Sequence, residues 1–284
     1  MYQIKAGKGF AILTIQKECL DLSHTFSSGQ AFRFYPTDRG YRGIANGRVL
    51  EITALAEGEF QLYPVDGELS TGFWKWFLDL DTDYSAIHRL LSFDEPVREG
   101  IAYAPGMRLL NQDPFETTIS FILSANNNIR RIQHIIEHLC KAVGKPIEGG
   151  YAFPTPQAIA ALSEMELRSL GMGYRARYVQ KTAQMVADGF DLPTLAHMEY
   201  PAAKAAIQSL PGVGPKVADC ILLFSLGHRC AFPQDTWVKK CMEKYYGLLP
   251  GQNVESFVEQ RFGHLAGYAN HYLFHHIRNR EENH

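Results

Sequence analysis

Lys216 and Asp235 are the two residues whose types and spacing best suit chemistry. Lys216 ends the run Leu210-Pro-Gly-Val-Gly-Pro-Lys216, and Asp235 follows it by 235 − 216 = 19 residues. A lysine in the first turn of a helix opposes the helix dipole, at a cost of roughly 0.3–1 kcal/mol. The same field disfavours the charged ammonium, and a neutral amine is what nucleophilic catalysis by lysine requires. The residues alone leave two interpretations open, a nucleophile or a surface lysine that contacts phosphate.

Asp235 stands where a helix is expected to begin. It follows Phe232-Pro-Gln and precedes Thr-Trp-Val, which is typical of an N-cap whose carboxylate accepts backbone N–H bonds. Such bonds favour the ionised form, so the carboxylate is suited to stabilising a developing cation. The alternative is that Asp235 only caps the helix.

A helix–hairpin–helix unit, at about residues 202–227, positions Lys216. Gly212 and Gly214 permit positive φ and so a tight turn, while Pro215 suits the first position of the second helix. That helix is expected to end at Gly227, a C′ glycine. The free N–H groups at its start form a site for a phosphate oxygen. The unit therefore indicates an enzyme that acts on DNA.

Composition narrows the class of protein. The chain has 284 residues, a net charge of −2, 46% hydrophobic and 20% charged residues, and no apolar run of membrane-spanning length. The N-terminus resembles neither a signal nor a transit peptide, and the five cysteines show no metal-ligand or iron–sulfur spacing. We therefore expect an intracellular protein (cytoplasmic, at the nucleoid if bacterial) with reduced thiols and no cofactor or required metal.

The hydrophobic pattern predicts an α+β fold in two parts. Residues 1–80 read as a β-rich domain with an antiparallel sheet, because strand-like runs at 10–15, 41–45, 48–53 and 59–63 include an Asn46-Gly47 hairpin signal. Residues 81–284 read as a mainly helical body containing the helix–hairpin–helix. Its expected helices cover residues 83–91, 114–123, 129–143, 155–162, 164–170, 178–188, 236–246, 254–262 and 267–277.

Five further segments carry a family resemblance, at residues 28–33, 110–114, 124–129, 170–178 and 267–274. Together with the hairpin, they make the chain resemble the 8-oxoguanine DNA glycosylase/AP lyases of the helix–hairpin–helix (HhH-GPD) DNA glycosylase superfamily. The resemblance implies an enzyme that flips 8-oxoguanine out of double-stranded DNA, preferably from opposite cytosine. It implies that Lys216 attacks C1′, that a Schiff base forms and that β-elimination cuts the strand. Asp235 would stabilise positive charge on the sugar.

The resemblance also assigns the base pocket. The Gly29 carbonyl would accept a bond from the N7–H that distinguishes 8-oxoguanine from guanine. Cys220 and Phe274 would sandwich the base, and Asn270, where the family usually has glutamine, would face its Watson–Crick edge. A C-terminal helix would pack near this site. Without the resemblance, Gly29 is a turn glycine, and Cys220 and Phe274 are core residues.

Other residues would contact the DNA duplex. Asn126 would fill the gap left by the flipped nucleotide, Tyr174 would wedge the kinked strand, and Arg131 and Arg175 would read the orphaned cytosine. Trp237 stands where the family often has a phosphate-contacting histidine. From the residues alone, Asn126 is a polar loop or cap residue and Arg175 a solvated or phosphate-contacting charge. The hairpin completes the set, with phosphate contacts at Gly212 and Gly214 and a monovalent cation at the carbonyls of Gln208, Leu210 and Val213.

Two other functions remain open at this point. A monofunctional glycosylase for alkylated bases would use Asp235 and water, and a non-catalytic helix–hairpin–helix protein would only bind DNA. Lys216 argues against the first, and Lys216 with Asp235 against the second. The expected partner is damaged duplex DNA; we expect a monomer and no membrane association.

Overall fold

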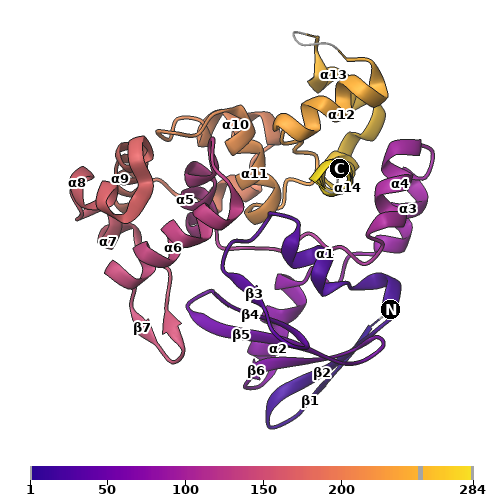
Figure 1. The fold of residues 1–284 in the computed structure, drawn as a ribbon, viewed down its shortest axis with the longest axis horizontal. Helices are drawn as coiled ribbons and strands as arrows, with labels where there is room; N and C mark the ends of the chain where they lie inside the picture. Colours follow the sequence, from indigo (N-terminus) through magenta and orange to yellow (C-terminus); the bar gives the residue numbers. More distant parts are fainter. Residues whose placement is uncertain (1, 249–251, 283–284) are drawn as a thin grey trace.

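A six-stranded antiparallel sheet forms the N-terminal part of the computed structural model, which describes residues 2–248 and 252–282 (Figure 1). The strand order is β1-β2-β6-β5-β4-β3. The strands are β1 (Tyr2–Ala6), β2 (Gly9–Ile15), β3 (Phe34–Pro36), β4 (Gly40–Ala45), β5 (Arg48–Ala56) and β6 (Glu59–Val65).

The sheet follows from alternation and turn chemistry. Asn46 and Gly47 have φ of 50° and 71°, as a type I′ turn requires, and they fix the pairing of Ala45 with Arg48. Leu50 and Ile52 alternate into the core and are fully buried. Helix α2 (Glu68–Phe77) contributes its own buried side chains to this core. The predicted antiparallel sheet is confirmed.

Some N-terminal elements were not predicted. Strands β1 and β3 and helices α1 (Leu22–Ser27) and α2 were absent from the expected elements. Strand β1 has no fully buried residue, and β3 has only three residues, so neither carries a periodic signal. These elements form through sheet pairing and packing.

The described part of the chain after the sheet is mainly helical, as predicted (Figure 1). The expected helix at 164–170 is confirmed, although residues 168–172 form a π-helix, and the chain kinks just beyond the predicted end, at Gly171, whose φ is 96°. The helices are α3 (Tyr84–Leu91), α4 (Glu95–Tyr103), α5 (Pro114–Ser124), α6 (Ile129–Val143), α7 (Pro156–Ala160), α8 (Glu164–Leu167), α9 (Ala176–Ala187), α10 (Tyr200–Ile207), α11 (Pro215–Ser225), α12 (Thr236–Tyr246), α13 (Val254–Phe262) and α14 (Ala266–Glu282). A short hairpin, β7 (Pro146–Ile147) and β8 (Gly150–Tyr151), follows α6.

Helices α10 and α11 form the helix–hairpin–helix unit. Gly212 adopts φ of 84°, and a Cβ there would lie 2.7 Å from Cβ of Tyr178, so the turn needs a glycine for two reasons. The expectation of positive φ at Gly214 is wrong, because its φ is −85° and it serves as the N-cap of α11. Gly227 has φ of 74° just beyond α11, as a C′ glycine does.

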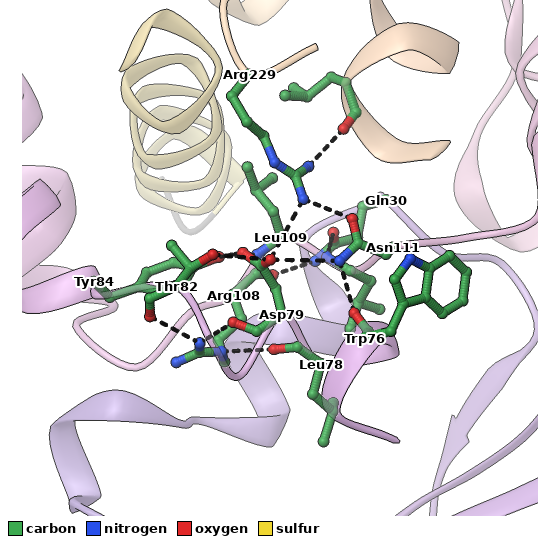
Figure 2. Close-up of polar contacts among 12 residues, drawn as sticks. Gln30, Trp76, Leu78, Asp79, Thr82, Tyr84, Arg108, Leu109, Asn111 and Arg229 are labelled. Carbon is green, nitrogen blue, oxygen red and sulfur yellow. Dashed lines mark hydrogen bonds and ion pairs between the residues drawn. The ribbon is translucent and has the colours of Figure 1, made fainter. Parts of the chain in front are cut away.

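A buried polar network joins the sheet region to the helical body (Figure 2). Arg108 is 2% exposed, and its guanidinium donates to the carbonyls of Leu78 and Cys19 at 2.7 Å each. Arg229, just after α11, donates to the Leu223 carbonyl at 2.7 Å and to Asn111 Oδ1 at 2.6 Å. The helix that carries Lys216 is thereby tied to the segment between the sheet and α5.

The division into domains at residue 80 stays a prediction. One core cluster surrounds the sheet and includes Leu110, whereas Phe32 packs into the core of the helical body. Each core therefore contains a residue from the other side of the predicted boundary.

Candidate active site

Lys216 and Asp235 line one cavity, although they lie on different helices. Lys216 is the second residue of α11, and Asp235 is the N-cap of α12. A small recess of about 50 Å³ holds both, and it adjoins an open cleft of about 790 Å³ that they also line. The recess is bounded by Ser28, Gly29, Phe121, Lys216, Cys220, Phe224, Pro233, Asp235, Asn270, His271 and Phe274.

The surroundings of Lys216 are mostly apolar. Its Nζ lies 5.3 Å from the ring centroid of Phe121, a buried residue of α5. Cys220 lies one turn along α11 on the same face and is 3% exposed. Burial raises the pKa of the Cys220 thiol to about 11, although the nearby Lys216 ammonium lowers it. Cys220 is therefore a neutral, apolar wall of the recess.

Asp235 caps α12 as predicted. Its Oδ1 accepts the N–H of Val238 at 2.8 Å. Burial nevertheless raises the pKa of this carboxyl, and it outweighs the opposing backbone hydrogen bonds from Val238 and Trp237 and the charge of Lys216. The expectation that hydrogen bonds dominate is thus wrong. A carboxylate held in a poorly solvated place exerts a stronger field on a neighbouring cation.

The turn at Gly29 is fixed by the residue that follows it. Gly29 has φ of 79°, and a Cβ there would lie 3.2 Å from Nη1 of Arg278. Gln30 is 1% exposed, and its amide donates to the Thr25 and Arg108 carbonyls at 2.9 and 2.8 Å. The buried Gln30 amide therefore holds the backbone of the Gly29 turn in place.

Helix α14 supplies a third wall, with Asn270, Phe274 and Arg278 spaced four residues apart on one face. Asn270 is 4% exposed, and its Nδ2 donates to the Pro233 carbonyl at 3.0 Å. The Arg278 guanidinium lies 5.1 Å from the centroid of Phe274 and donates to the Ser27 carbonyl at 2.7 Å. Helix α14 thus joins the Gly29 turn to the loop before Asp235.

The open cleft carries polar and aromatic side chains at its edge. Asn126 has φ of 49° and is exposed on the loop between α5 and α6. Trp237 is partly exposed, and Nζ of Lys240 lies 4.6 Å from its ring centroid. The structure brings Asn126 and Trp237 together at the cleft with Lys216 and Asp235.

The two arginines expected to read cytosine lie differently. Arg131 is exposed near the start of α6, but Arg130 lines the cleft. Arg175 is 4% exposed, and its guanidinium donates to the carbonyls of Ala125 and Asn126. Arg175 therefore holds the loop that presents Asn126.

Two other predictions concern the surroundings of this loop and the hairpin. Tyr174 is 51% exposed, and its ring lies 4.5 Å from the Arg175 guanidinium, beside the loop that carries Asn126. Its role in wedging the kinked DNA strand stays a prediction. At the hairpin, the Leu210 carbonyl accepts the Val213 N–H at 3.1 Å. The cation at Gln208, Leu210 and Val213 stays a prediction.

Several residues of the recess and cleft were not predicted from the sequence, among them Phe121, His271 and Arg278. Phe121 lies in an apolar helical run, which resembles ordinary core. His271 and Arg278 follow Asn270 on α14, and only the four-residue spacing from Asn270 through Phe274 pointed to Arg278. Within the described ranges, the structure contains no group of three or more His, Cys, Asp or Glu side chains that could hold a metal. It also contains no helix long and apolar enough to cross a membrane there.

The fold and site define a class of protein. Residues 119–263 match the family model of HhH-GPD superfamily base excision DNA repair proteins, so the chain belongs to that superfamily. Residues 12–118 match the model of the 8-oxoguanine DNA glycosylase N-terminal domain. Within the superfamily, the chain is a member of the 8-oxoguanine DNA glycosylase family.

Comparisons with individual proteins agree with these family matches. The chain is 32% identical to a probable N-glycosylase/DNA lyase of Methanothermobacter thermautotrophicus, over 72% of this chain and 73% of that one. It is 32% identical to an N-glycosylase/DNA lyase of Arabidopsis thaliana, over 90% and 76%. The solved structure of Clostridium acetobutylicum 8-oxoguanine glycosylase/lyase, in complex with duplex DNA containing cytosine opposite 8-oxoguanine, superposes with a TM-score of 0.91. Its identity is 34%, and 99% of this chain and 98% of that one are covered.

Proposed function

We propose that this protein removes 8-oxoguanine from double-stranded DNA, preferably opposite cytosine, and then cuts the strand at the abasic site. The supporting observation is the convergence of Lys216, Asp235 and the Gly29 turn on one recess. An amine, a buried carboxylate and a backbone turn, brought there from three separate segments, suit attack on a flipped nucleotide.

The proposed reaction begins at the lysine amine. Nζ of Lys216 bonds to C1′ of the deoxyribose as the C1′–N9 bond breaks, and the bonding pair leaves with the base, which takes up a proton. Positive charge develops on the sugar during this step, and the Asp235 carboxylate lies in the same recess to stabilise it. Loss of an amine proton and opening of the sugar ring give the Schiff base. Loss of the C2′ proton then expels the 3′ phosphate by β-elimination.

Borohydride trapping tests this proposal. Wild-type protein with 8-oxoguanine duplex should give a covalent protein–DNA adduct on reduction, and Lys216→Gln should give none. Lys141→Gln is the matched control, because Lys141 is exposed at the far end of α6. Adenine in place of cytosine should lower the yield. A wild-type protein that forms no adduct would contradict the lyase chemistry.

The variants also separate the alternative functions. Base excision that survives in Lys216→Gln would indicate a monofunctional glycosylase that uses Asp235 and water. Duplex affinity that is the same with and without the lesion, with no excision, would indicate a protein that only binds DNA.

A further inference from the structure

His271 is a buried histidine on the wall of the base recess. It follows Asn270 on α14, is 3% exposed, and lines the recess with Lys216 and Cys220. Its ring packs edge-on against Phe224, with centroids 5.7 Å apart and planes at 65°. This packing leaves the imidazole little freedom to turn away from the recess.

The Nε2 atom of His271 is buried and has no hydrogen-bond partner among the residues that the structure describes. Burial lowers the pKa of His271 well below its usual range, and the charges of His275, Arg278 and Arg229 act in the same direction. The imidazole is therefore neutral and offers one donor and one acceptor nitrogen. Because a buried polar atom without a partner is costly, native proteins rarely keep one unless something binds there.

The neighbouring polar side chain is already engaged. Nδ2 of Asn270 donates to the Pro233 carbonyl, which holds the short amide against the wall. The Gly29 turn lies on the same recess, so a purine that presents its imidazole edge to that turn presents its Watson–Crick edge elsewhere. The unpaired Nε2 is suited to meeting that edge.

We propose that His271 is a further substrate-binding residue, whose Nε2 accepts a hydrogen bond from the Watson–Crick edge of the flipped purine. The donor is N1–H or the 2-amino group, and Nδ1 carries the histidine proton. This inference rests on the proposed function, since it concerns the base that occupies the recess. It makes His271 a determinant of which base is excised.

Single-turnover excision of 8-oxoguanine opposite cytosine tests the inference. His271→Phe keeps an aromatic ring and removes the acceptor, and we expect excision to slow by about 5- to 150-fold, the range for one buried polar group left without its partner. His271→Gln offers another acceptor and should recover part of the rate. His276→Phe is the matched control, because His276 lies on the same helix outside the recess and should leave the rate unchanged.

Cleavage of a duplex that already contains an abasic site shows whether His271 recognises the base or only supports the fold. That substrate has no base to bind, so His271→Phe should cut it at the wild-type rate. Equal slowing on both substrates would show a structural role and overturn the inference, as would wild-type excision of 8-oxoguanine by His271→Phe.

A duplex containing 8-oxohypoxanthine, which lacks the 2-amino group, identifies the donor. If wild type and His271→Phe excise 8-oxohypoxanthine at about the same rate, the donor to Nε2 is the 2-amino group. If wild type remains faster than His271→Phe on this base, the donor is N1–H. Borohydride trapping of the wild type distinguishes failure of the proposed function from failure of the His271 role. Without an adduct the proposed function fails and the His271 role with it, whereas an adduct with no effect of His271→Phe overturns only the latter.

Discussion

The base recess and the loop beside the opposite strand are built in different ways. The recess gathers residues from five separate segments, and most of its walls are buried, as at Cys220 and Asn270. The loop draws on two segments, and Asn126 and Arg131 are exposed, while Tyr174 is 51% exposed. The recess is therefore shaped by the protein core, and the loop is shaped by a few polar contacts.

Arg175 is a buried residue that supports the exposed loop. Its buried guanidinium spans the Ala125 and Asn126 carbonyls, so an arginine expected to read DNA also supports Asn126, whose φ is positive. Positive φ in a residue other than glycine persists where surrounding contacts enforce it. A preformed recess suits rejection of normal bases, whereas an exposed loop suits adjustment to a kinked duplex.

The largest effect is expected in the recess, at Asp235. Asp235→Asn keeps a side chain able to cap α12 but removes the negative charge, so single-turnover excision should fall by about 10²- to 10³-fold, as for loss of one preorganised electrostatic group. Duplex affinity should stay near wild type. An excision rate within threefold of wild type would remove Asp235 from the proposed chemistry.

The difference in stability between Asp235→Asn and wild type should depend on pH. Because burial raises the folded pKa of Asp235, stability is lost as pH rises from the unfolded pKa towards the folded pKa, and the loss is complete above the folded pKa. Asp235→Asn should therefore be at least as stable as wild type at pH 7, and the gap should narrow as pH falls toward the unfolded value of about 3.9. Urea unfolding at pH 4 and 7 measures this, and a variant less stable at pH 7 would contradict it.

Substitutions of Arg175 and Arg131 should differ in their effect on stability. Arg175→Ala should lose stability and relax discrimination between cytosine and adenine by about tenfold or more, because the Asn126 loop loses its support. Arg131→Ala should relax discrimination, within the 1–3 kcal/mol of one bidentate base contact, and leave stability unchanged. Thermal melting and paired excision assays measure both; an Arg131→Ala variant that melts early would break the contrast.

Gly29→Ala should have a smaller effect. Alanine at φ of 79° is strained by roughly 1–2 kcal/mol, and its Cβ would meet Arg278 at 3.2 Å. We expect excision to slow by about tenfold through displacement of the Gly29 carbonyl. Gly72→Ala is the control, because a Cβ at this helical glycine meets nothing within 4 Å, and it should be stabilising.

The smallest effect is expected at Trp237, on the edge of the cleft. Trp237→His should change duplex affinity only about two- to threefold, since an imidazole still stacks on a neighbouring group. At pH 6, a protonated histidine that contacts phosphate should steepen the slope of log K against log salt by up to about 0.9. A tenfold loss of affinity would show that Trp237 is a main DNA contact.

Local sequence predicted those features that depend on local backbone chemistry. The Asn46-Gly47 turn, Pro215 at the start of α11, the Asp235 cap and the Gly227 C′ position all lie where the residue types favour them. The backbone conformations of Gly171, with φ of 96°, and Gly214, with φ of −85°, were not predicted, because a glycine permits several conformations and the surrounding fold selects one.

The sequence by itself determined the helix–hairpin–helix, the position of Lys216 in the first turn of its helix and, through its motifs, the family. Tertiary structure alone decided that Arg175 faces inward to the Ala125 carbonyl and that burial outweighs hydrogen bonding at Asp235. It also placed His271 on the wall of the recess, with a buried Nε2 that has no partner among the described residues. Caps and turns depend on neighbours within a few residues, whereas burial and side-chain direction depend on segments far apart in the chain, such as Arg175 and Ala125.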